Sequence, residues 1–125
     1  SGELCCPPLP NIKEEDKKRV YYYSIFPNML LSLHPEYVMY HTVWPIGINR
    51  SKVTCSWLFT EEIINSNDHK IKEAVDFWDM TNKQDWHISE LSQLGIQSSK
   101  YSPAPYSGQE SLLAAFDKHY KKIIN

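Results

Sequence analysis

The sequence is poor in glycine and cysteine and has no long hydrophobic run, and each shortage excludes a class of protein. Only four glycines are scattered through the 125 residues, and none forms a glycine-rich loop for binding phosphate. The three cysteines, Cys5, Cys6 and Cys55, are an odd set with two adjacent members, which argues against a disulfide framework and predicts reduced thiols. No run approaches the roughly 20 apolar residues that span a bilayer, and no signal-peptide pattern opens the chain. We therefore expect a cytoplasmic protein.

The cysteines also lack the spacing of a metal site. No Cys-x-x-Cys, Cys-x-His or Cys-x-x-His occurs, which excludes a structural zinc or an iron–sulfur cluster built from this chain alone. Cys55 is instead expected to be a small buried hydrophobic residue.

The composition predicts one globular domain. Hydrophobic residues make up 42% of the chain and aromatic residues 13%, with eight Tyr and four Trp, which exceeds what a disordered chain carries. A domain of this length buries roughly two thirds of its unfolded surface. The net charge is −2, and the one dense charged run, Lys13 to Arg19, alternates in sign, so neither a nucleic acid nor a membrane is an expected partner.

The first part of the chain reads as a lead-in segment followed by strands. Residues 1–18 are the lead-in, which contains the proline-rich CCPPLP. Ser1-Gly2 resembles a remnant of an expression vector, so we expect residue 1 to be an arbitrary cut into a longer protein. Beyond it, β-favouring residues and turn residues alternate, with PIGINR as a turn, and predict a four-stranded antiparallel meander. The predicted strands are Arg19–Phe26, Met29–Leu33, Tyr37–Trp44 and Lys52–Thr60, and Val53, Cys55, Trp57 and Phe59 share one face of the last.

The second part has helical periodicity. From about Asp68 to Ser99 no proline interrupts the chain, which predicts two or three helical segments, and Ser107 with Glu110 matches a capping box that would start a final helix. Strands followed by helices indicate an α+β fold with helices on one face of an antiparallel sheet. The expected apolar side of the first helical region is Phe77, Met80, Ile88, Leu91 and Gly95; that of the final helix, expected to lie on the sheet, is Leu112, Leu113, Phe116, Tyr120, Ile123 and Ile124.

The five histidines give no convincing metal site. His34 and His41 would face opposite sides of one extended strand. His87 is two residues from Asp85, about 200° around a helix. His69 and Glu73 are spaced to chelate at i and i+4, but such pairs are common surface contacts. His119 is expected to be a partly exposed packing residue.

Asp85 lies beside a tryptophan, on the predicted border between the apolar side of the helix and water. Its helical neighbours are Thr81, Asn82, Ile88 and Ser89. From helix geometry alone a solvated or capping acid is the favoured interpretation. If the carboxylate points inward, it requires a cation or a hydrogen-bond donor, because an unpaired buried charge costs several kcal/mol.

Three blocks of sequence together resemble a known enzyme family. They are FPNMLLSLHPEYVMYHTVWPIGINRSKVTCSWLF (26–59), FWDMTNKQDWHISELSQLGIQSS (77–99) and YSPAPYSGQESLLAAFDKHY (101–120). Their order and spacing are similar to the C-terminal part of the catalytic domain of Rieske-type ring-hydroxylating oxygenases, in the alpha or large subunit. The resemblance extends from about Leu9 to Ile124, so residues 19–125 are expected to be this catalytic part.

The resemblance implies a helix-grip (START-like) fold and a mononuclear non-haem Fe(II) held by two histidines and one carboxylate. The family's helical pattern of Asp, Glu, Gln and Gly corresponds here to Asp85, Glu90, Gln93 and Gly95. Asp85 is thereby carried over as the iron ligand, whereas the roles of Glu90 and Gln93 are left open between helix packing and subunit contacts.

The resemblance also shows what this chain lacks. The family's two histidine ligands come from an upstream motif, and its 2Fe-2S cluster lies in a separate N-terminal domain. None of the five histidines here sits in that ligand motif. We therefore expect the isolated chain to bind iron weakly or not at all and to be inactive.

For the full-length parent, the resemblance implies oxygen insertion from O₂ into an aromatic or related small organic substrate. Electrons would arrive from a reductase or ferredoxin through the cluster of a neighbouring subunit in a trimer, so a homo-oligomer is expected. Substrate identity and mono- versus dioxygenation stay open. Tyr22, Phe26, Trp57 and Phe59 are expected to line the core or a cavity, with core favoured.

Two other functions compete with the oxygenase. Helix-grip domains also serve as ligand-binding modules without chemistry, and this piece lacks most of an active site. A purely structural assembly surface is the third possibility. Because a part of a larger domain exposes apolar area that is normally covered, we also expect self-association.

Overall fold

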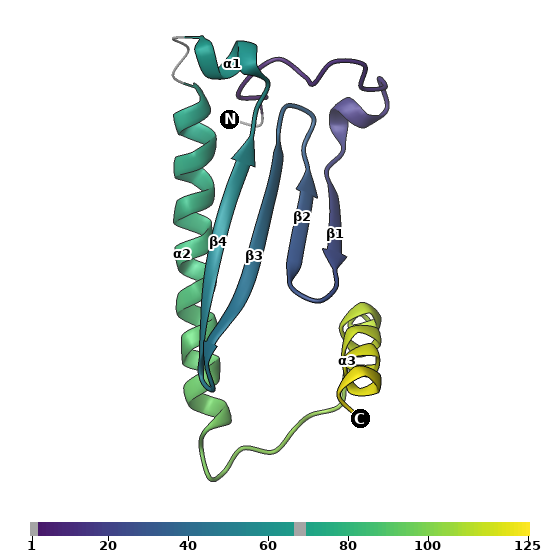
Figure 1. Ribbon diagram of the computed structural model, residues 1–125, viewed down its shortest axis with the longest axis vertical. Helices are drawn as coiled ribbons and strands as arrows, with labels where there is room; N and C mark the ends of the chain where they lie inside the picture. The colour runs from purple at the N-terminus through teal and green to yellow at the C-terminus, as the bar shows by residue number, and fades with distance from the viewer. Residues whose placement is uncertain (1–2, 67–69) are drawn as a thin grey trace. The chain divides into compact units, whose positions relative to one another are not determined.

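The computed structural model describes residues 3–66 and 70–125 (Figure 1). Ser1, Gly2, Asp68 and His69, on which predictions were placed, lie outside these residues. The chain divides into two compact units, the first running to Met80 and the second from Thr81 to Asn125. The elements are a 3-10 helix η1 (Asp16–Lys18), strands β1 (Tyr21–Ile25), β2 (Met29–Leu33), β3 (Val38–Gly47) and β4 (Arg50–Leu58), and helices α1 (Glu61–Asn65), α2 (Lys70–Ile96) and α3 (Ser111–Ile124).

The strands form one antiparallel sheet in the order β1-β2-β3-β4, which confirms the predicted meander and the α+β class. Figure 1 shows them side by side in chain order. Cross-strand partners in an antiparallel ladder share a face. Tyr22 pairs with Ser32, Ser32 with Met39, and Met39 with Trp57, so these four residues form one row across the sheet.

The turn predicted at PIGINR is shorter in the structure. Strand β3 continues to Gly47 and β4 begins at Arg50, so only Ile48 and Asn49 connect them. A register shift between Pro45 and Gly47 marks a bulge in the ladder. A bulge lets the strand bend, which allows Pro45 to stay inside a strand although it has no N–H to donate.

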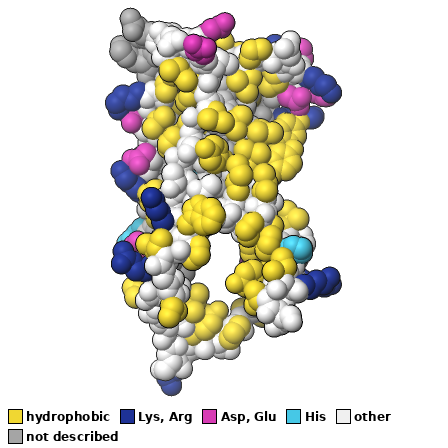
Figure 2. All heavy atoms as spheres, viewed as in Figure 1, with side chains coloured by type: hydrophobic (Ala, Val, Ile, Leu, Met, Phe, Trp, Pro, Cys, Tyr) yellow, Lys and Arg dark blue, Asp and Glu magenta, His cyan; other side chains and the backbone are white. Residues whose placement is uncertain are grey.

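The core of the first unit is small and centres on the middle of the sheet. Tyr37, Met39 and Ala74 are buried, and Cys55, Trp57 and Phe59 are partly buried against them. This confirms the predicted inward face of the last strand, although Cys55 is not fully buried. Hydrophobic side chains also gather on the surface over the sheet in Figure 2.

Tyr22 contradicts the prediction that it lines the core, because 66% of its surface is exposed. Its row reaches the core at Met39, two strands away, and β1 is the edge strand of the sheet. Phe26, in the β1–β2 connection, is partly buried.

Helix α2 docks on the sheet through a buried tyrosine. The Trp78 indole N–H donates a hydrogen bond to the Tyr37 hydroxyl over 2.7 Å. The Tyr37 ring stacks on His34 at 4.4 Å between centroids and packs against Phe59 at 5.2 Å. Burial raises the pKa of Tyr37 to about 12, so the hydroxyl stays protonated. This cluster fixes the first turns of α2 against the β2–β3 turn.

The predicted helical region is one continuous helix rather than two or three segments, and the predicted apolar side is wrong. Phe77 and Met80 are more than half exposed, whereas Ala74 and Asn82 are buried. The prediction selected the most hydrophobic positions, but the small Ala74 allows close packing, and the amphipathic Trp78 docks by its N–H. Helix α1 was not predicted, because five residues carry too little periodicity.

Helix α3 begins later than the capping box predicts. The Ser107 backbone N–H donates to the Glu110 carboxylate over 2.6 Å, which is one half of the box. The first helical residue is nevertheless Ser111, with Glu110 at the N-cap, because residues 108 and 109 form a turn instead. The six residues predicted as the apolar side of α3 are all exposed, and their placement on the sheet stays a prediction.

Among the described residues, no helix combines the length and the hydropathy that crossing a membrane requires.

Replacing Trp78 with Phe should lower the free energy of unfolding by about 1–3 kcal/mol, because the buried Tyr37 hydroxyl loses its donor. Denaturant titration followed by circular dichroism measures this change. Trp44→Phe, at a site 58% exposed in β3, is the matched control and should change stability by less than about 0.5 kcal/mol. Equal effects of the two substitutions would show that the hydrogen bond contributes nothing.

Stability should fall as the pH drops below about 6.5, because burial lowers the pKa of His34 in the folded protein and the unfolded chain then binds the proton more readily. The stability that neutral His34 contributes is fully present above about pH 6.5. It is lost as the pH falls from there towards the lower pKa that His34 has in the folded protein. His34→Gln should flatten the dependence between pH 7.5 and 5, measured as unfolding midpoints in urea. The exposed His87→Gln should leave the slope as in the parent, and a slope unchanged by His34→Gln would contradict the assignment.

Candidate functional site

Asp85, the predicted iron ligand, lies in the second half of α2 with its side chain exposed. Asp85 follows Trp78 by seven residues, so the two side chains leave the helix axis in directions that differ by about 20°. Ala74 and Trp78 on that side pack in the core of the first unit, and Asn82 is 6% exposed. Asp85 itself is exposed, and its role as a metal ligand stays a prediction.

The other residues of the family pattern occupy the last turns of the same helix. Glu90, Gln93 and Gly95 are all exposed. Near them, the hydroxyl groups of Ser89 and Ser92 donate to the carbonyl oxygens of Asp85 and Ile88, each over 2.9 Å. These bonds engage backbone oxygens one turn earlier and leave the Asp85 carboxylate outside the helix's own hydrogen bonding.

The described residues bring no second and third metal ligand to Asp85. Within residues 3–66 and 70–125 no group of three His, Cys, Asp or Glu side chains is placed to hold a metal ion. His34 lies in the β2–β3 turn and His41 in β3 rather than on one extended strand, while His87 and His119 are exposed on helices. The predicted His69–Glu73 pair cannot be placed, because His69 is outside the described residues.

His34 is a packing residue of the aromatic cluster. Besides stacking on Tyr37, its ring meets Trp78 edge-on at 5.6 Å and Tyr22 edge-on at 6.4 Å between centroids. Its Nε2 atom is buried and has no hydrogen-bond partner. Burial lowers its pKa, so the ring is neutral at pH 7 and suits an apolar environment.

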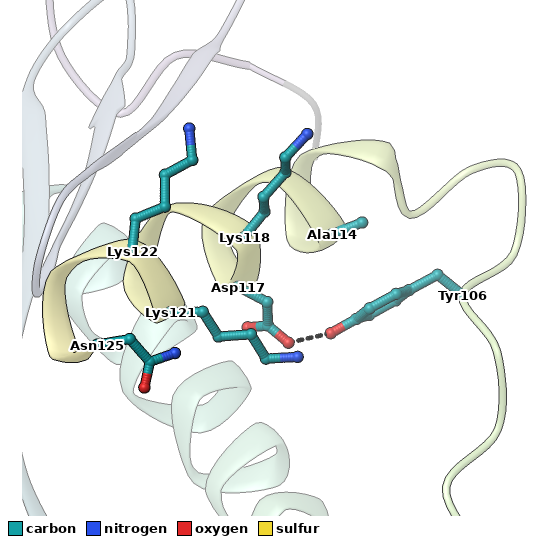
Figure 3. Close-up of a pocket in the computed structure, with 7 residues that line it drawn as sticks. All are labelled: Tyr106, Ala114, Asp117, Lys118, Lys121, Lys122 and Asn125. Atoms are coloured by element: carbon teal, nitrogen blue, oxygen red, sulfur yellow. Dashed lines mark hydrogen bonds between the residues drawn. The ribbon is translucent and has the colours of Figure 1, made fainter.

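The second unit has an open groove of about 610 Å³ along α3. Figure 3 shows Tyr106 donating its hydroxyl hydrogen to the Asp117 carboxylate, a bond that raises the pKa of Tyr106. The amino groups of Lys118 and Lys122 extend away from this bond. The groove thus presents separate surface charges and no converging set of catalytic groups.

The sequence prediction missed a buried carboxylate. Glu36, in the β2–β3 turn, is 8% exposed, and its Oε2 atom is buried without a hydrogen-bond partner. Its Oε1 atom lies 3.9 Å from the Cys5 sulfur. The flanking Pro35 and Tyr37 indicated a turn but not burial, and no local pattern would have distinguished this glutamate from a solvated one.

These features define an α+β protein with a four-stranded antiparallel sheet and a long helix that carries the exposed Asp85. The chain matches the family described as "Ring hydroxylating alpha subunit (catalytic domain)" over residues 2–125. It belongs to that family of Rieske-type oxygenase alpha subunits.

Curated relatives carry a more specific name. The glycine betaine monooxygenase oxygenase subunits of two Pseudomonas aeruginosa strains are 36% identical over 72 residues, covering 58% of this chain and 17% of theirs. The subunit of the same name from Chromohalobacter salexigens is 31% identical over 81 residues, covering 65% of this chain and 18% of its own length. The chain thus spans less than a fifth of these relatives. No solved structure matches it.

Gly95→Ala should raise the free energy of unfolding by about 0.5 to 1 kcal/mol, because glycine in a helix costs that much relative to alanine and an added Cβ meets nothing within 4 Å of the described atoms. Unfolding in urea measures the gain. Gly108→Ala adds the same methyl group in an equally open turn outside a helix and should gain less. A loss of stability at Gly95 would reveal a close contact there.

Proposed function

We propose that this chain is the C-terminal part of an oxygenase catalytic domain and that Asp85 is the carboxylate ligand of a mononuclear Fe(II). The observation that carries the proposal is the match to the family, which extends over residues 2–125 and includes Asp85 as an exposed residue of α2, three residues beyond the buried Asn82. Glu90, Gln93 and Gly95 follow at the family's spacing.

The described residues do not fit a complete iron site. Asp85 is one oxygen donor, and no group of three possible ligands occurs among residues 3–66 and 70–125. Two histidines from the polypeptide outside this chain would complete the set. A two-histidine, one-carboxylate iron leaves coordination positions open for O₂ and substrate, which is the chemistry that the metal supplies when bound.

The contribution of this chain is to hold the carboxylate in place. The Trp78–Tyr37 hydrogen bond and the buried Ala74 fix the first turns of α2, and the helix continues without a break to Ile96. Asp85 lies on this continuous helix, and functional sites are built more precisely on helices than on loops.

The names of the relatives suggest the substrate. Glycine betaine monooxygenase subunits from two genera match this chain, so we place a small quaternary amine such as glycine betaine first and an aromatic compound second. The parent would insert one or two O₂-derived oxygen atoms into this substrate. It would draw electrons from a reductase or ferredoxin through a 2Fe-2S cluster in another domain, and would work as a homo-oligomer, a trimer in the family.

In the full-length parent, Asp85→Ala should lower iron content and product formation at least about tenfold, because second-sphere changes alone cost 10–100-fold and this change removes a ligand. Iron is measured by elemental analysis and product by mass spectrometry. Glu90→Gln on the same helix is the matched control and should retain iron. Full turnover in Asp85→Ala would refute the ligand assignment.

The isolated 125-residue chain offers a second check on the same proposal. It should lose added Fe(II) to a chelator during gel filtration, because a single carboxylate holds a metal weakly. Stoichiometric iron retained through the chelator would mean that this chain carries a complete site of its own.

A further inference from the structure

Two adjacent thiols and a buried carboxylate meet where the lead-in segment crosses the β2–β3 turn. The Cys5 and Cys6 sulfur atoms are 3.7 Å apart. Cys5 Sγ lies 3.9 Å from Glu36 Oε1, and Cys6 Sγ donates to the Glu36 backbone carbonyl over 3.8 Å. Both cysteines are reduced and partly buried. The Leu9 backbone N–H donates to the Pro35 carbonyl over 2.7 Å, which holds the lead-in against this turn.

Glu36 has more hydrogen-bonding capacity than its surroundings use. It is 8% exposed and its Oε2 atom is buried with no partner. Its Oε1 atom receives only the weak and shared Cys5 S–H, since one thiol hydrogen serves both the Cys6 sulfur and this oxygen. The carboxylate therefore has free acceptor positions directed at the neighbouring thiols.

The two cysteines differ in their surroundings. Cys5 packs against the core of the first unit, and burial, with the hydrogen bond to Cys6 next, raises its pKa to about 12. Cys5 is therefore a thiol at pH 7 and needs a local base before it can attack. Cys6 is not among the residues that pack against the core cluster, and it is the better placed of the two to meet a small solute.

We propose that Cys5, Cys6 and Glu36 form a peroxide-reactive dithiol site, in which Cys6 is oxidised, Cys5 closes a disulfide with it, and Glu36 accepts the Cys5 proton. The Cys6 thiol releases its proton to solvent, its thiolate attacks one oxygen of hydrogen peroxide, the O–O bond breaks, and the released hydroxide takes up a proton from solvent to leave as water. The Cys5 sulfur then gives its proton to Glu36 and attacks the Cys6 sulfenic sulfur. The S–O bond breaks and Glu36 returns the proton to the departing hydroxide.

The step balances as two thiols and one peroxide giving one disulfide and two waters. The cysteines lose two electrons and the peroxide gains them, which is the first part of the cysteine oxidation ladder. Closure brings the sulfur atoms from 3.7 Å to about 2.05 Å and removes the thiol donors from Glu36. The proposed dithiol site depends only on the geometry of the first unit. Its test is therefore independent of the proposed oxygenase activity.

The test is treatment of the purified chain with stoichiometric hydrogen peroxide, followed by trypsin digestion and mass spectrometry without reductant. The peptide ending at Lys13 should lose two hydrogens and return to its original mass with a thiol reductant. Cys55→Ser, outside the site, should behave as the parent does. A disulfide that joins two copies, or an unmodified peptide, would overturn the proposal.

The three site variants separate the roles. Cys5→Ser should accumulate a Cys6 sulfenic acid that a dimedone probe captures, and Cys6→Ser should react slowly. Glu36→Gln should slow disulfide closure at least about tenfold while sulfenic acid formation at Cys6 keeps its rate, because only the second step uses the base. Circular dichroism checks that each variant is folded. Equal slowing of both steps in Glu36→Gln would assign that residue a structural role only and refute its part in the proposal.

Discussion

The hydrogen bond from Trp78 to Tyr37 is the contact on which the first unit depends. It joins α2 to the β2–β3 turn at the point where the core is most buried. The same turn stacks His34 on the Tyr37 ring and holds the lead-in through Pro35 and Glu36. Two segments that are distant in sequence, the lead-in and α2, therefore meet at this turn, and Cys5 and Trp78 pack against the small core that contains Met39.

The candidate site residue lies on the same helix as this anchor. Asp85 follows Trp78 by seven residues on α2, a spacing that nearly repeats one side of an α-helix, and its side chain is exposed. The family match extends over the whole second unit, and the ligand role proposed for Asp85 depends on it. Fold and family together make Asp85 the residue on which the proposed oxygenase function rests, while the dithiol beside Glu36 belongs to the other end of the first unit.

The strands were predicted closely because their signals are local. Turn residues separate short stretches of β-favouring side chains, and Cys55 and Trp57 follow the alternation that a half-buried strand requires. The inward side of α2 was predicted wrongly because periodicity weighs hydrophobicity alone. A small Ala74 and a hydrogen-bonding Trp78 occupy the docked side, whereas the more hydrophobic Phe77 is exposed. The prediction that Tyr22 lies in the core was also wrong, because β1 is an edge strand of the sheet and is too far from the small core.

The sequence by itself determined the element order, the α+β class and the family, because strand alternation, helix periodicity and motif spacing are properties of neighbouring residues. It also predicts Asp85 as a metal ligand, through the resemblance of the pattern with Glu90 and Gln93, and this stays a prediction. Only the tertiary structure decided which side of α2 faces the core and which polar groups are buried. The burial of Glu36 beside Cys5 depends on a lead-in segment packing against a turn some 30 residues away, and contacts at such separation leave no trace in local sequence patterns.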